Sequence, residues 1–80
     1  MKNDFTLEVY SENAFSVLNR MINIFNRRRI RIRSLLATEL EADYKHGMAS
    51  FKLHTTAEQL ERAMHQLEKL IEVERVVRIN

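Results

Sequence analysis

The chain has 80 residues, of which 45% are hydrophobic, with one glycine and no proline or cysteine. This length predicts one small domain over residues 1–80, and the composition excludes a disordered chain, disulfide bonds and thiolate metal sites. The formal net charge is +2, but five of the 13 basic residues lie within residues 27–33. The rest of the chain carries eight basic and 11 acidic residues. A generally basic, nucleic-acid-binding surface is therefore excluded, and one basic strip remains.

The first two elements are a strand and a helix. Phe5, Leu7 and Val9 alternate with polar residues, which predicts a half-buried strand. Asn13 is suited to cap a helix that runs from Ala14 to about residue 27. Its apolar residues form one broad stripe: Ala14, Val17, Leu18, Met21, Ile22, Ile24 and Phe25.

A hairpin is predicted next. Ile30 and Ile32 alternate with arginines, as in a strand, and the alternation slips at Leu35–Leu36, which indicates a bulge or bend. The polar segment 41–47, which ends on the single glycine, predicts the turn. A third strand follows, with its apolar side made by Ala49, Phe51 and Leu53.

The last two elements are a helix and a strand. Thr56 and Gln59 form a capping box for a helix that ends at Glu72, and residues 73–79 form the last strand. The helix stripe comprises Ala57, Leu60, Met64, Leu67 and Ile71. The order βαββαβ predicts an α+β, ferredoxin-like plait, in which two helices cover one face of a four-stranded antiparallel sheet. Right-handed crossovers give the strand order 4-1-3-2, with the second and fourth strands at the edges.

The sequence holds no convincing catalytic or metal-binding set. His46, His54 and His65 fall in a turn, on a strand and on a helix, and their spacing does not suggest a ligand trio. Glu39 and Glu41 lie close together in the sequence, as do Glu58 and Glu61, and each pair suits solvated charge better than acid–base chemistry. No glycine-rich phosphate loop is present. No segment resembles a signal peptide or a membrane span, so we expect a cytoplasmic, non-enzymatic binding module without a membrane partner.

RNA binding is an alternative, because RNA-recognition domains share this topology. Those domains stack bases on exposed aromatics of the first and third strands, and here only Tyr10 could do so, beside the repelling charge of Glu8. Arg27 to Arg29 suit the negative end of a helix dipole, and Arg31 and Arg33 suit an edge strand. Nucleic acid is therefore not expected as a partner.

Two stretches, "YSENAFSVLNRMINIFNRRRIRIRSLLA" and "HQLEKLIEVERV", carry a family resemblance. Together they resemble the ACT-domain regulatory (small) subunit of acetohydroxyacid synthase, also called acetolactate synthase, in its short, single-domain type. The matching residues are Glu12, Asn13, Leu18, Phe25, Ile32, Ser34, Leu35, Gln66, Leu67, Lys69, Leu70, Val73 and Val76.

The resemblance implies a non-catalytic subunit that binds and activates the catalytic large subunit in branched-chain amino acid biosynthesis. Thiamine diphosphate, magnesium and flavin would belong to that partner, and this chain would bind no cofactor. The family forms homodimers through edge strand two, with valine or another branched-chain amino acid as effector. The effector site is implied at Asn13, Ala14, Phe15, Ser16, Val17 and Leu18 of one chain and at Arg31 and Ile32 of its neighbour.

Two positions depart from the family pattern. Ser16 stands where the family has glycine, and Arg31 stands where it has asparagine. Ser16 adds a side chain where an effector comes close to the backbone. Arg31 could fill the pocket, pair with Glu12 or Glu39 across the dimer, or bind a carboxylate bidentately. We expect weakened or absent valine feedback with activation retained. A stand-alone ACT sensor for another amino acid remains the alternative, and an RNA-binding plait is a third, less favoured hypothesis.

Overall fold

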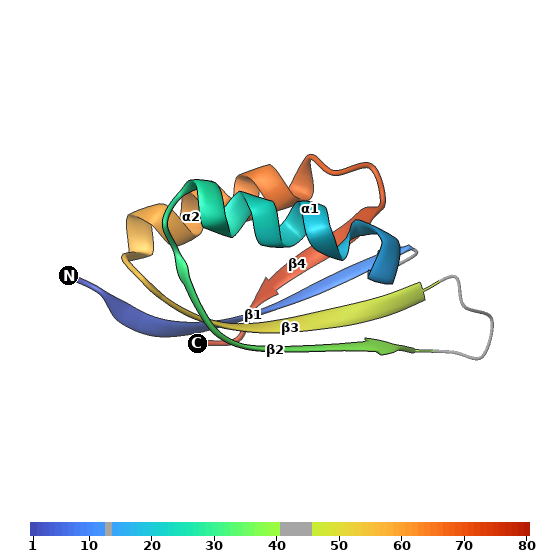
Figure 1. The fold of residues 1–80 in the computed structure, drawn as a ribbon, viewed down its shortest axis with the longest axis horizontal. Helices are drawn as coiled ribbons and strands as arrows, with labels where there is room; N and C mark the ends of the chain where they lie inside the picture. Colours follow the sequence, from blue (N-terminus) through green and yellow to red (C-terminus); the bar gives the residue numbers. More distant parts are fainter. Residues whose placement is uncertain (13, 41–45) are drawn as a thin grey trace.

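The computed structural model describes residues 1–12, 14–40 and 46–80. The order of elements confirms the predicted βαββαβ plait. Its elements are β1 (Asn3–Glu12), α1 (Ala14–Arg27), β2 (Arg31–Glu39), β3 (His46–Thr55), α2 (Ala57–Glu68) and β4 (Val73–Arg78). The four strands form one sheet in the order β2-β3-β1-β4, in which every neighbouring pair is antiparallel. Both helices cover one face of this sheet, and β2 and β4 are its edges, as predicted (Figure 1).

The core lies between the helices and the inward face of β1 and β3. The alternation expected in these two strands is confirmed, because Phe5, Leu7, Val9, Ala49, Phe51 and Leu53 are all buried. Helix α1 contributes Val17, Met21 and Phe25, and α2 contributes Leu60, Ala63 and Leu67, all fully buried. The ring of Phe25 packs on that of Phe51 with centroids 4.8 Å apart. Burial of this apolar surface is the main force that holds both helices on the sheet.

The predicted end of the second helix was wrong. Helix α2 ends at Glu68, and the backbone N–H of Lys69 closes its last turn on Gln66. Ile71 therefore lies beyond the helix with its side chain 97% exposed, and Ala57 is also exposed. At the start of the helix the prediction was right, since the Oγ1 of Thr56 accepts the N–H of Gln59 at 3.1 Å.

Strand β2 contains the predicted irregularity, but nearer its start. Ile32 pairs with Leu53 and Ser34 with Lys52, so Arg33 is the extra residue. After this bulge, odd-numbered residues such as Leu35 take the helix-facing side. In the sequence the alternation of apolar and polar residues breaks only at Leu35 and Leu36, because both are apolar. The bulge was therefore predicted at these residues instead of at Arg33.

The N-cap at Asn13 and most of the predicted turn at 41–47 lie outside the described residues. Gly47, predicted to end that turn, is a buried residue of β3. Among the described helices, none has the length and apolar content needed to cross a membrane.

Helix α1 ends in a Schellman motif whose left-handed residue is an arginine. Ile30 N–H donates to Phe25 C=O at 2.9 Å, Arg29 N–H donates to Asn26 C=O at 3.1 Å, and Arg29 has φ 56°. A non-glycine residue pays a steric cost in this conformation.

Glycine at position 29 is therefore expected to stabilise the protein. We predict that Arg29→Gly raises the free energy of unfolding by about 1 kcal/mol, as measured by urea denaturation. Arg27→Gly is the matched control, because residue 27 is still helical and glycine there should destabilise by a similar amount. A loss of stability in Arg29→Gly would contradict this account of the helix end.

Candidate functional site

The first turn of α1 is one half of the predicted effector site. Phe15 is 54% exposed and Ser16 is exposed, so both residues lie at the surface. Leu18 is half-buried, and Val17 is fully buried in the core. The side chain of Val17 therefore cannot contact an effector, and only its backbone could contribute. Asn13 and the side chain of Ala14 lie outside what the structure describes.

The other predicted half is at the start of β2. Arg31 is exposed and pairs with His54, whereas Ile32 is half-buried and pairs with Leu53. His54 in turn pairs with Asp4 near the beginning of β1. This end of the sheet carries both chain termini and is opposite the end at which α1 begins (Figure 1). Within one chain, the two halves of the predicted site are therefore at opposite ends and do not meet.

The open edge of the sheet combines unpaired backbone with apolar side chains. Among the described strands, β2 pairs only with β3, and none of them lies along its other side. Leu35 is 37% exposed, Leu36 65% and Leu40 50%. Leu35 is opposite core residue Phe51 and Leu36 is opposite Ser50, so they point to different faces of the sheet. An edge of this kind is suited to accept another strand. The edge position of β2 was predicted from the sequence, whereas its apolar character was not.

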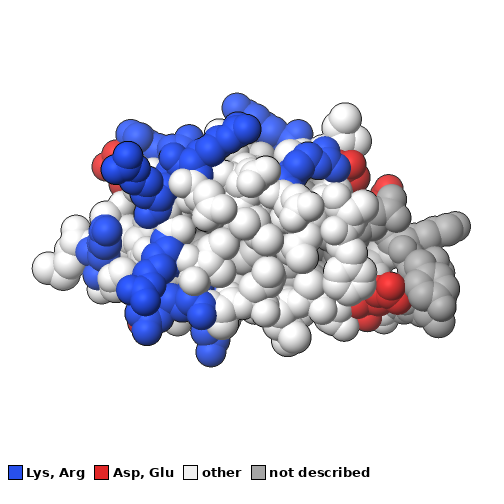
Figure 2. Space-filling view, viewed as in Figure 1, with Lys and Arg blue, Asp and Glu red and all other residues white. Residues whose placement is uncertain are grey.

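Charge is unevenly distributed along the molecule. On the face shown in Figure 2, lysine and arginine side chains gather at the end that carries the termini and the turn between α1 and β2. At this end a cleft of ≈ 300 Å³ is lined by Asp4, Phe5, Thr6, Arg33, Lys52 and Asn80. The His54 Nδ1 is 2.7 Å from the Asp4 carboxylate, and this hydrogen bond, helped by the charge of Arg33, lowers the pKa of Asp4. The cleft is therefore of mixed charge, which does not favour a polyanion.

Among the residues that the structure describes, the sheet face opposite the helices offers no base-stacking platform of the RNA-recognition type. Tyr10 is the single aromatic residue predicted there, and its hydroxyl donates to Glu8 at 2.9 Å. The guanidinium of Arg75 lies 4.2 Å from the Tyr10 ring centroid, so this ring is already partly covered. Stacking on RNA would require this contact to open.

Arg28 and Arg20 have structural partners. Arg28 Nε donates to Gln66 at 2.6 Å and its Nη1 to Gln59 at 3.4 Å, which ties the end of α1 to α2. Arg20 pairs with Glu72, and the hydrogen bond from Arg20 lowers the pKa of that carboxyl. Because the folded-state pKa of Glu72 is lowered, its ion pair with Arg20 stabilises the fold at pH values above the pKa of the unfolded state. This stabilisation is lost as the pH falls through the folded-state pKa.

Comparisons with known proteins identify the fold. The family described as AHAS small subunit-like ACT domain matches residues 7–75. The ACT domain of GTP pyrophosphokinase from Chlorobium tepidum superimposes with a TM-score of 0.82 at 15% identity, covering 99% of this chain and 100% of that one. The C-terminal domain of MgtC from Mycobacterium tuberculosis gives 0.76 at 16% identity, covering 94% and 83%. These two likenesses show the fold alone.

A further similar structure is that of an acetolactate synthase small subunit. The acetolactate synthase small subunit from Thermotoga maritima superimposes with a TM-score of 0.82 at 23% identity, and covers 98% of this chain. The chain spans 48% of the length of that protein. No curated protein sequence matches the chain significantly. Since the family match extends over most of the sequence and the structure has the ACT topology, the chain belongs to the family of AHAS small subunit-like ACT domains.

Proposed function

We propose that the protein is a cytoplasmic, non-catalytic regulatory subunit that binds and activates the catalytic subunit of acetohydroxyacid synthase. The family match over residues 7–75 carries this proposal, and the similarity to the Thermotoga maritima small subunit supports it. Thiamine diphosphate, magnesium and flavin would be bound by the catalytic subunit. Co-elution of the two purified proteins on size exclusion is the first test, and separate elution at micromolar concentrations would count against the proposal.

Dimerisation through β2 is the second part of the proposal. Side-by-side pairing of β2 with the same strand of a second copy would satisfy the open backbone groups and cover Leu35 and Leu36. A two-fold axis makes such a pairing antiparallel, so the beginning of one β2 comes beside the end of the other. The partner's Arg31 and Ile32 would then approach Glu39 of the first chain, at the end of the sheet where α1 begins. Two-fold pairing is thus a geometry that unites the separated halves of the site.

The effector would be an amino acid held between these halves. Backbone N–H groups in the first turn of a helix suit the carboxylate of an amino acid. Phe15 and Ser16 are exposed there, and the guanidinium of Arg31 from the second copy would enter the same space. Because both Ser16 and Arg31 are larger than the family residues, valine would bind poorly and feedback would be weak.

This interpretation predicts that valine binding can be restored by two substitutions. In isothermal titration calorimetry, the natural protein should show no saturable valine binding at sub-millimolar concentrations. The valine affinity of the double variant Ser16→Gly/Arg31→Asn should be at least about tenfold higher, because smaller side chains on both sides of the site leave room for the ligand. Asn23→Gly/Arg62→Asn is the control, since it also introduces one glycine and replaces one arginine by asparagine, on exposed helix surfaces. Tight valine binding by the natural protein would overturn the prediction of weak feedback.

A stand-alone ACT sensor for a different amino acid is the second candidate. It is supported by the fold likeness to the ACT domain of a different protein, the GTP pyrophosphokinase of Chlorobium tepidum. Binding of an amino acid without any association with the catalytic subunit would select this candidate.

A further inference from the structure

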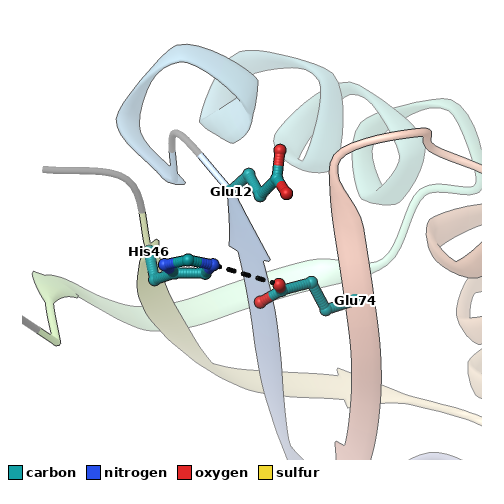
Figure 3. Close-up of side chains that lie close together, drawn as sticks. All are labelled: Glu12, His46 and Glu74. Atoms are coloured by element: carbon teal, nitrogen blue, oxygen red, sulfur yellow. Dashed lines mark ion pairs between the residues drawn. The ribbon is translucent and has the colours of Figure 1, made fainter.

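Three potential metal ligands converge at the end of the sheet where β1 leads toward α1. Glu12 belongs to β1, His46 to β3 and Glu74 to β4, and one ligand atom of each lies within 4.8 Å of the other two (Figure 3). The His46 Nε2 is 3.3 Å from the Oε2 of Glu74. Glu12 and Glu74 are exposed and His46 is half-buried, so solvent ions can reach the cluster.

Strand pairing and a bulge produce this convergence. Glu12 and His46 are direct partners in the β1–β3 ladder. On the other side of β1, Tyr10 pairs with Arg75 and Ser11 with Val73, so Glu74 is the extra residue of a bulge. Bulges redirect side chains out of strict strand alternation. Glu74 can therefore reach across β1 to His46, although its strand is not adjacent to β3.

An ion pair alone accounts for only part of the cluster. The His46–Glu74 contact leaves Glu12 as a second carboxylate within 4.8 Å of the other ligand atoms. Within the described parts of the chain, the Glu12 side chain has no hydrogen-bond or ion-pair partner. A cation placed between the two carboxylates would be attracted by both of them.

We propose that Glu12, His46 and Glu74 form a binding site for a divalent cation of the Zn²⁺ type. One imidazole nitrogen with two carboxylate oxygens is a donor set that Zn²⁺ accepts, with water completing the coordination. Three atoms within 4.8 Å of one another enclose a point at most about 2.8 Å from each, so shifts below about 1 Å would give bonds of about 2.0–2.2 Å.

The bound ion would join three strands of the sheet. Because the ligands come from β1, β3 and β4, the site exists only in the folded chain, so the ion would stabilise the fold by mass action. This role does not depend on the proposed regulatory function.

Titration of the full, chelator-treated chain with Zn²⁺ alone tests the proposal. By calorimetry we expect one site per chain, with affinity at least about tenfold weaker in His46→Ala, and also weaker in the isosteric variants Glu12→Gln and Glu74→Gln. His54→Ala is the matched control, because His54 also faces a carboxylate from a neighbouring strand, that of Asp4. In thermal melts, Zn²⁺ should raise the midpoint of the natural protein and of the control more than that of His46→Ala.

Two results would overturn the proposal. The first is an absence of saturable Zn²⁺ binding to the natural protein. The second is equal Zn²⁺ affinity in the natural protein and in Glu12→Gln. Glu12 is exposed, so this substitution should leave the fold intact, and equal affinity would mean that the Glu12 carboxylate is not a ligand. His46 and Glu74 would then form only an ion pair.

Discussion

Replacing Leu36 by lysine is expected to convert the protein from a dimer to a monomer. Leu36 is 65% exposed on the edge strand, where the proposed two-fold pairing would bury it in both copies. Burial of one leucine contributes about 1.5–3 kcal/mol, so the loss of two symmetry-related side chains amounts to about 3–6 kcal/mol. The dimer dissociation constant should therefore rise by roughly two to four orders of magnitude.

Sedimentation velocity over a concentration series would measure this change. Ile71→Lys is the matched control, since Ile71 is 97% exposed and lies outside the strands, so it should remain dimeric. If Leu36→Lys remains as dimeric as the control, the edge of β2 is not the dimer interface.

Replacing Phe25 by alanine is expected to have the largest effect on stability. Phe25 is fully buried in α1 and packs on Phe51 at the centre of the core. Removal of a buried phenylalanine side chain costs about 3–5 kcal/mol. A domain of this size has a total stability of roughly 4–12 kcal/mol, so the variant should be marginally folded.

Urea denaturation followed by circular dichroism would measure this loss. Phe15→Ala is the control, because Phe15 is on the same helix and is 54% exposed. We expect its cost to stay below about 1 kcal/mol in the monomer. Similar losses in the two variants would contradict the assignment of Phe25 to the core.

The fold was predictable because each element has its own local pattern. The alternation around Phe51 and the helical stripe around Phe25 identify their elements without knowledge of the rest of the chain. The end of α2 was not predictable in this way. Ile71 continues the apolar stripe in the sequence, yet the chain has already left the helix at Lys69, and the residue points to solvent.

The sites depend on contacts that the sequence does not display. Glu12, His46 and Glu74 are far apart along the chain, and only the pairing of three strands and a bulge in β4 bring them together. The predicted effector site is a different case. Phe15 and Arg31 are both exposed, and they lie at opposite ends of one chain. That they form one effector site remains a prediction, because a second copy of the chain would have to bring them together.

Acetolactate formation by the same organism's catalytic subunit tests the regulatory role most directly. The rate should be measured with and without this protein, each in the presence and absence of valine, with Leu36→Lys as a further arm. The proposal predicts a higher rate when the natural protein is added, little inhibition by valine, and a loss of the activation with Leu36→Lys. An unchanged rate at saturating protein would contradict the proposal and would limit the relationship to the ACT domain itself.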